Sequence, residues 1–99
     1  MIKHIVMWKL KKELREDIQK CNQVDVFYEL FFLKHKIPQI KTFNAGINCN
    51  PENDYDIVLE IEFESMNDFN AYIEHPDHIR VVEFLEPYTE QLASIDFEL

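Results

Sequence analysis

One short segment of the chain concentrates side chains that could do acid–base or metal chemistry. Residues 71–79, with the sequence AYIEHPDHI, place His75 and His78 three positions apart, with Pro76 between them and Tyr72 upstream. Imidazole exchanges protons near neutral pH or binds a metal, and a phenol can donate a hydrogen bond to a substrate. The segment therefore allows a metal site, an acid–base pair, or a plain junction between two helices.

His78 is the better placed of the two histidines to act as a base. Proline is favoured at the first position of a helix, so His78 falls in a first helical turn. There the positive end of the helix dipole favours the neutral imidazole, which can accept a proton. From the residues alone, a partly buried histidine that only bonds to backbone at the helix break is the more common case; the family resemblance described below puts the two interpretations on an equal footing.

His75 has a different expected role, because it precedes a proline and is held in extended geometry. It need not point the same way as His78, and no third ligand stands at a recognisable spacing. We therefore predict no metal site and interpret His75 as a hinge residue. Cys21 and Cys49 fit no metal or redox motif, and neither has a base motif beside it.

Two more candidates lie on apolar faces. Tyr72 stands with Phe69 and Ile73 on one side of a predicted helix, where a tyrosine is either core or orients a substrate. His4 shares a strand face with Trp8, which would supply an aromatic pocket wall. A histidine that is satisfied structurally is the alternative for His4. The roles of Tyr72 and His78 depend on each other.

The composition limits the class of partner. Nineteen Asp and Glu against ten Lys and Arg give a net charge of −9, which repels nucleic acid and anionic membranes. No apolar run approaches the length of a membrane-spanning helix, and the first residues lack the features of a signal peptide. We expect one domain over residues 1–99, cytoplasmic, with no cofactor and no nucleic-acid or membrane partner. The apolar fraction of 46% leaves apolar surface for a partner or a ligand.

Hydrophobic periodicity predicts the order β-α-β-β-α-β. Alternation indicates strands at residues 2–10, 40–48, 55–63 and 94–99. Three-to-four spacing indicates a helix at 13–36 and a second helix from 66 to about 86, broken at His75–Pro76 and capped by Ser65. The first helix is expected to bury a stripe made of Leu14, Ile18, Cys21, Val24, Tyr28, Phe31, Phe32 and His35, widened by Phe27, Leu30 and Leu33. The order is that of an α+β, ferredoxin-like subunit with an antiparallel four-stranded sheet.

Several segments together resemble the stress-responsive A/B-barrel (Dabb) family. They are IKHIVMWKLK at the start, KIPQIKTFNAGIN, YDIVLEIEFES, AYIEHPDHIRVVEFLEP and the closing DFEL. The resemblance covers nearly the whole chain except most of the first helix. It implies a homodimer in which two sheets pair face to face as a dimeric α/β barrel. Apolar residues that would need such cover are Ile5, Met7, Val58, Phe43 and Ile47.

The family also implies roles for individual residues. In a plant polyketide cyclase of this family, a histidine of the HPxH segment is the base and an earlier tyrosine helps to hold the substrate. His78 and Tyr72 stand at the matching positions, and His4 matches a further pocket histidine. Ile57 stands where the cyclase has another pocket histidine, which puts the same substrate in doubt. We expect His4, Trp8 and Ile57 to bind a small aromatic or acyl compound.

Two other functions stay open at this point. The protein could be a non-catalytic stress or interaction protein whose dimer is structural. It could also be a cofactor-free monooxygenase, because related dimeric barrels host that chemistry, an argument from fold alone. A pocket that connects His4, Tyr72 and His78 would count against the first of these alternatives.

Overall fold

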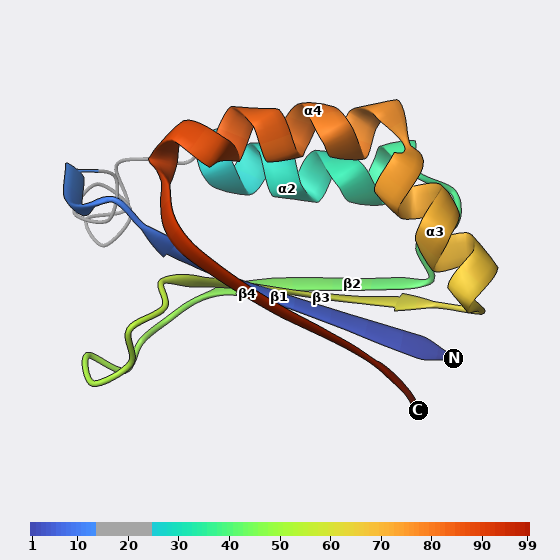
Figure 1. The fold of residues 1–99 in the computed structure, drawn as a ribbon, viewed down its shortest axis with the longest axis horizontal. Helices are drawn as coiled ribbons and strands as arrows, with labels where there is room; N and C mark the ends of the chain where they lie inside the picture. The colour runs from blue at the N-terminus through green and yellow to red at the C-terminus, as the bar shows by residue number, and fades with distance from the viewer. Residues whose placement is uncertain (14–24) are drawn as a thin grey trace.

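In a computed structural model, which describes residues 1–13 and 25–99, helices cover one face of a four-stranded sheet (Figure 1). The elements in chain order are β1 (Ile2–Leu10), α2 (Asp25–Lys36), β2 (Thr42–Ile47), β3 (Ile57–Phe63), α3 (Met66–Glu74), α4 (Pro76–Leu85), the short 3₁₀ turn η1 (Glu86–Tyr88) and β4 (Thr89–Glu98). None of the helices in these two ranges is long and apolar enough to span a membrane.

The strands lie in the order β2-β3-β1-β4, and every neighbouring pair is antiparallel. This topology confirms the predicted ferredoxin-like α+β subunit. The register of the central strand places His4 opposite Ile61 on one side and Asp96 on the other. Trp8 likewise lies opposite Ile57 and Leu92, so the two candidate residues of β1 share a sheet face, as their spacing predicts.

The core lies between that sheet face and the helices. β1 and β3 alternate strictly between buried and half-buried side chains, because only one face of each strand is covered by helices. The buried face of these strands consists of Ile2, His4, Val6, Trp8, Leu10, Ile57, Leu59, Ile61 and Phe63. The helices add Leu30, Leu33, Tyr72, Val81 and Leu85 to the same core.

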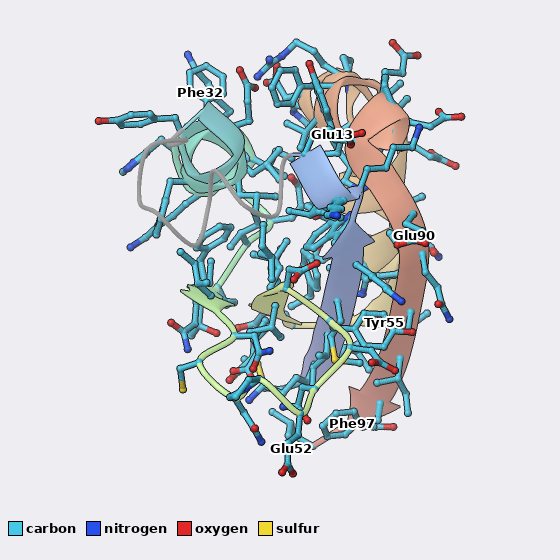
Figure 2. All side chains as sticks on the ribbon, turned by 90° about the vertical axis from the view of Figure 1, so that its left-hand side faces the viewer. Glu13, Phe32, Glu52, Tyr55, Glu90 and Phe97 are labelled. Carbon is cyan, nitrogen blue, oxygen red and sulfur yellow. The ribbon has the colours of Figure 1, made fainter. Side chains whose placement is uncertain are left out.

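The buried stripe of α2 differs from the prediction. Leu30 and Leu33 are each 1% exposed, whereas Tyr28 is 70% exposed and Phe31 and Phe32 lie at the surface. The helix carries an aliphatic and an aromatic stripe side by side, and the aliphatic stripe is the one turned toward the sheet. Figure 2 shows Phe32 projecting from the helical layer. His35 is also exposed. The predicted stripe residues Leu14, Ile18, Cys21 and Val24 lie outside the described residues.

The side of the sheet away from the helices also differs in part. Phe43 and Ile47 lie opposite Ile61 and Ile57, so their register places them on the helix side rather than on the open side. The alternation of β2 alone gives the period of the strand and cannot say which side is covered. The open side carries instead Ile5, Met7, Val58, Ile95 and Phe97, the last of which Figure 2 shows below the sheet.

Strand β4 begins at Thr89, five positions before the predicted start at Ser94. Its first half is polar and mostly exposed, because β4 is an edge strand whose ladder with β1 needs no alternating apolar residues. The pairing reaches back to Leu10 opposite Thr89. The break between α3 and α4 falls at His75–Pro76, as predicted, and Ser65 caps α3 by accepting a hydrogen bond from Asp68 N–H at 3.2 Å.

Candidate active site between the helices and the sheet

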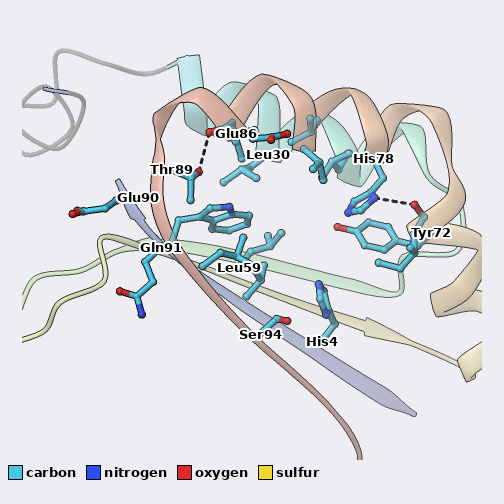
Figure 3. Close-up of a pocket in the computed structure, with 18 residues that line it drawn as sticks. His4, Leu30, Leu59, Tyr72, His78, Glu86, Thr89, Glu90, Gln91 and Ser94 are labelled. Atoms are coloured by element: carbon cyan, nitrogen blue, oxygen red, sulfur yellow. Dashed lines mark hydrogen bonds between the residues drawn. The ribbon is translucent and has the colours of Figure 1, made fainter. Parts of the chain in front are cut away.

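A cavity of about 500 Å³ lies between the helical layer and the sheet, on the side of β4 (Figure 3). Most of its walls are apolar and come from β1, β3, α2 and α4, with Val6, Trp8, Leu33 and Leu85 among them. Figure 3 shows His4, Tyr72 and His78 together toward one end, and Glu86, Thr89, Glu90 and Gln91 toward the other. The cavity therefore has hydrogen-bonding groups at both ends and an apolar body between them.

The composition of β4 explains why this space is not filled. On the helix side, β4 places Ser94 opposite Val6 and Asp96 opposite His4. These two side chains are small or charged, and beside Leu92, which is 53% exposed, they offer little apolar surface on which a helix could dock. Helix α4 packs on α2 and α3 instead, and the layers stay apart along the β4 edge. Exposed residues of both elements, among them Val82 and Leu92, border the opening.

His78 is oriented as a base. Its Nδ1–H donates to the carbonyl oxygen of Ile73 at 3.1 Å, which leaves the lone pair on Nε2. Figure 3 shows that second nitrogen turned toward the cavity. Burial lowers the pKa of His78, and the nearby charges of His4 and His75 lower it further, against the opposing hydrogen bond to Ile73. The imidazole is therefore neutral at pH 7 and can accept a proton.

Tyr72 lies directly beside His78, with 4.4 Å between the ring centroids. Its side chain is 1% exposed and also packs on Phe63 at 5.0 Å and His4 at 6.0 Å. Burial raises the pKa of the phenol, so the hydroxyl stays protonated and is a hydrogen-bond donor. The hydroxyl points into the cavity in Figure 3 and forms no hydrogen bond with the residues that the structure describes.

His4 is held by a partner that the sequence did not identify. Its Nδ1–H donates to a carboxylate oxygen of Asp96 on the neighbouring strand, in a very short hydrogen bond. This contact fixes the ring and its tautomer, which leaves the Nε2 lone pair for the cavity. The ring also packs on Phe69 at 5.2 Å. The alternation of residues 94–99 places Asp96 on a strand face, but only the register with β1 reveals its partner.

The remaining predicted residues divide into two groups. Trp8 lines the cavity, so the structure brings together His4, Trp8, Tyr72 and His78. Ile57 does not line it; it is packed in the core beside Trp8 and borders a second hollow at the far end of the sheet. His75 also lies off the cavity, at the junction of α3 and α4. Within residues 1–13 and 25–99, no three His, Cys, Asp or Glu side chains are grouped so as to hold a metal ion.

Comparison with known proteins places this architecture in a family. The family model described as Stress responsive A/B Barrel Domain matches residues 2–99. Olivetolic acid cyclase from Cannabis sativa is 28% identical over 100 residues, which cover 97% of this chain and 94% of that protein. The stress-response A/B barrel domain-containing protein DABB1 from Arabidopsis thaliana is 27% identical over 97 residues. These cover 98% of this chain but 46% of DABB1, so the chain spans about half the length of that relative.

A solved structure gives the same result for the fold. A dimeric protein of unknown function with a ferredoxin-like fold, from Bacteroides fragilis, is 28% identical and superimposes with a TM-score of 0.82. The match covers 99% of this chain and 95% of the other. The family model matches every residue except the first, and the chain has the ferredoxin-like fold predicted for this family. This chain therefore belongs to the stress-responsive A/B-barrel domain family.

Proposed function

We propose that the protein binds a small molecule with an apolar body and a carbonyl-bearing end, and acts on it by general acid–base catalysis. The observation that supports this proposal is the presence of His4, Tyr72 and His78 at one end of a single apolar cavity. A volume of about 500 Å³ lies in the usual range for small-molecule sites. Olivetolic acid cyclase, 28% identical, is a relative whose name denotes a cyclisation.

The geometry suits an intramolecular aldol condensation. In this proposal Nε2 of His78 removes a proton from a carbon next to a carbonyl group, and the resulting enolate carbon attacks a second carbonyl of the same molecule. The His78 imidazolium returns the proton to the new alkoxide, and loss of one water from the resulting alcohol completes the condensation. The Tyr72 hydroxyl donates a hydrogen bond to the oxygen that gains negative charge. His4, oriented by Asp96, offers a second nitrogen close to the same end of the cavity. The apolar body of the ligand lies against Trp8.

Occupancy of the cavity is tested by a matched pair of variants on α4. Val82 lines the cavity and is 47% exposed, whereas Ile79 is 45% exposed and does not line it. Val82→Phe should weaken binding of the neutral fluorescent probe N-phenylnaphthylamine, and Ile79→Phe should not. Energy transfer from Trp8, the single tryptophan, reports binding. Equal binding by both variants, or none by the wild type, would exclude this cavity as the site.

Catalysis is tested with His78→Gln and a short linear β-triketone, whose cyclisation to a resorcinol releases one water. The variant should bind the probe as the wild type does and lose turnover. Binding without any turnover in the wild type would favour a binding protein over an enzyme. If the protein consumes oxygen with reduced quinols but not with the triketone, the monooxygenase alternative is favoured. If the wild type neither binds the probe nor converts the triketone, the alternative of a non-catalytic protein with a structural dimer is favoured.

We also propose that the protein is a homodimer that pairs through the open side of the sheet. No helix of the described residues covers this side (Figure 1), although it carries apolar side chains. Ile95 and Phe97 are 60% and 41% exposed there. The Bacteroides fragilis protein of the same fold is dimeric. In a symmetric dimer, the open side of each copy would cover the open side of the other.

The dimer is tested by Ile95→Asp, which places a carboxylate on the open side of the sheet. Sedimentation should show a dimer for the wild type and a monomer for the variant. Tyr28→Asp, on the exposed side of α2, is the control and should leave the dimer intact. A dimer that survives Ile95→Asp contradicts the proposed interface. A cytoplasmic location and the lack of nucleic-acid partners stay predictions, the second from the net charge of −9.

A further inference from the structure

We infer that His75 is a positioning residue for Tyr72 and His78, and that it holds the two rings together through a cap whose form depends on protonation. Only the effect of His75 on ligand binding rests on the proposed function. The positioning itself concerns the junction between α3 and α4, outside the cavity.

Three hydrogen bonds converge on His75. Its backbone N–H donates to the carbonyl of Tyr72 at 3.1 Å and closes α3. Its own carbonyl accepts from the N–H of Ile79 at 3.0 Å, and its Nδ1 accepts from the N–H of Asp77 at 3.1 Å, so that it also begins α4. One residue is thus the last cap of one helix and the first cap of the next.

This junction sets the distance between the two candidate catalytic rings. Tyr72 lies three residues before His75 and His78 three residues after it, on different helices. The bond from His78 Nδ1–H to Ile73 O crosses the same junction. A change in the angle between the helices would therefore alter both this bond and the 4.4 Å spacing of the rings. Pro76 restricts the backbone of His75 to the extended region, so the side-chain cap is the part that can change.

The cap requires an unprotonated Nδ1, because only that form has a lone pair for the N–H of Asp77. A protonated ring has no acceptor, but a carboxylate oxygen of Asp77 lies 3.8 Å from the same nitrogen. Both partners of a two-state contact are therefore in place: the backbone N–H for the neutral ring and the carboxylate for the charged ring.

Other charged groups surround this contact and have opposing signs. His78 faces it from α4, and Glu74 precedes it on α3. Glu29 and Lys36 of α2 and Arg80 of α4 line one shallow hollow with Asp77, and Arg80 pairs with Glu29 at 2.6 Å.

The test compares His75→Asn and His75→Ala with the wild type by NMR between about pH 5 and 8. Asparagine is a strong N-cap whose side-chain oxygen accepts in place of Nδ1 and does not titrate. We expect the pH dependence of the Tyr72 ring signals to differ between the wild type and His75→Asn, because only the imidazole can exchange the N–H of Asp77 for its carboxylate. His75→Asn should keep the neutral-pH signals. His75→Ala should show displaced Tyr72 and His78 signals at every pH.

Binding of N-phenylnaphthylamine separates this inference from the proposed function. His75→Ala should bind the probe about threefold to tenfold more weakly, because the competent arrangement is less populated, and His75→Asn should restore the affinity. Unchanged Tyr72 and His78 signals in His75→Ala would overturn the positioning role, and the same pH dependence in wild type and His75→Asn would overturn the dependence on protonation. If the wild type binds no probe while the NMR result holds, the proposed function fails and the role of His75 stands. Should His75→Ala not fold, His75→Asn alone decides.

Discussion

The substitution Tyr72→Phe separates the two interpretations of this tyrosine, as a core residue or as a donor to a ligand. It deletes the hydroxyl and keeps the ring, which is 1% exposed and packs on Phe63, His4 and His78. No void is created among these rings. The change in the free energy of unfolding therefore reports the hydrogen bonding of the hydroxyl almost alone.

The expected magnitude follows from the surroundings of the oxygen. A tyrosine whose hydroxyl is bonded within the protein loses about 0.5–1.5 kcal/mol of stability on becoming phenylalanine. The Tyr72 hydroxyl points into the cavity and has no hydrogen-bond partner among the described residues. The oxygen faces the cavity and is not one of the buried polar atoms that lack a partner, so we expect the stability to change by less than about 0.5 kcal/mol. Loss of the whole ring in Tyr72→Ala should cost about 3–5 kcal/mol.

Urea unfolding of both variants measures these differences, with Tyr28→Phe at the surface as the control that should change nothing. In the triketone assay Tyr72→Phe should reduce turnover, because the developing oxyanion loses its donor. A variant of unchanged stability and lower activity agrees with a hydroxyl kept for function. A loss of more than about 1 kcal/mol would show that the hydroxyl bonds within the protein, and it would refute the donor role.

Three further outcomes follow from the site and its supports. His78 should titrate by NMR below its ordinary pKa of about 6.5, and a midpoint at or above 6.5 contradicts the burial argument. Because the unfolded chain binds the proton more readily than the folded protein, protonation of His78 lowers stability as the pH falls through 6.5. Asp96→Ala should replace the single Nδ1–H tautomer of His4 by a mixture in nitrogen NMR spectra, and an unchanged tautomer would mean that another group orients the ring. Ser65→Ala should destabilise the protein by about 0.5–2 kcal/mol in urea, while Ser65→Asp should retain the cap of α3; equal stability of the two would remove Ser65 as a cap.

Features that depend on neighbouring residues were predictable from the sequence. The alternation predicts strands over residues 2–10 and 55–63, and the structure has strands at Ile2–Leu10 and Ile57–Phe63. The helix break at His75–Pro76 and the cap at Ser65 follow from local backbone chemistry. These signals need no knowledge of the rest of the fold.

Features that depend on which side is covered were not predictable in the same way. The aromatic stripe of α2 is as apolar as the aliphatic one, and the sequence does not say which of them meets the sheet. In β2 the period of two is visible, but a choice of side is not, so Phe43 and Ile47 were assigned to the wrong face. Both errors concern the packing of one element on another.

Strand β4 shows how far this limit reaches into the site. Its register with β1 turns Ser94 and Asp96 to the helix side and Ile95 and Phe97 to the open side. A slip of one residue would exchange the two sets. The apolar pair would then fill the space beneath α4, the partner of His4 would be lost, and the β4 part of the open side would become polar. One pairing of distant strands therefore supports both the cavity and the proposed dimer face. Loss of binding in a variant of β4 must accordingly be interpreted together with its oligomeric state.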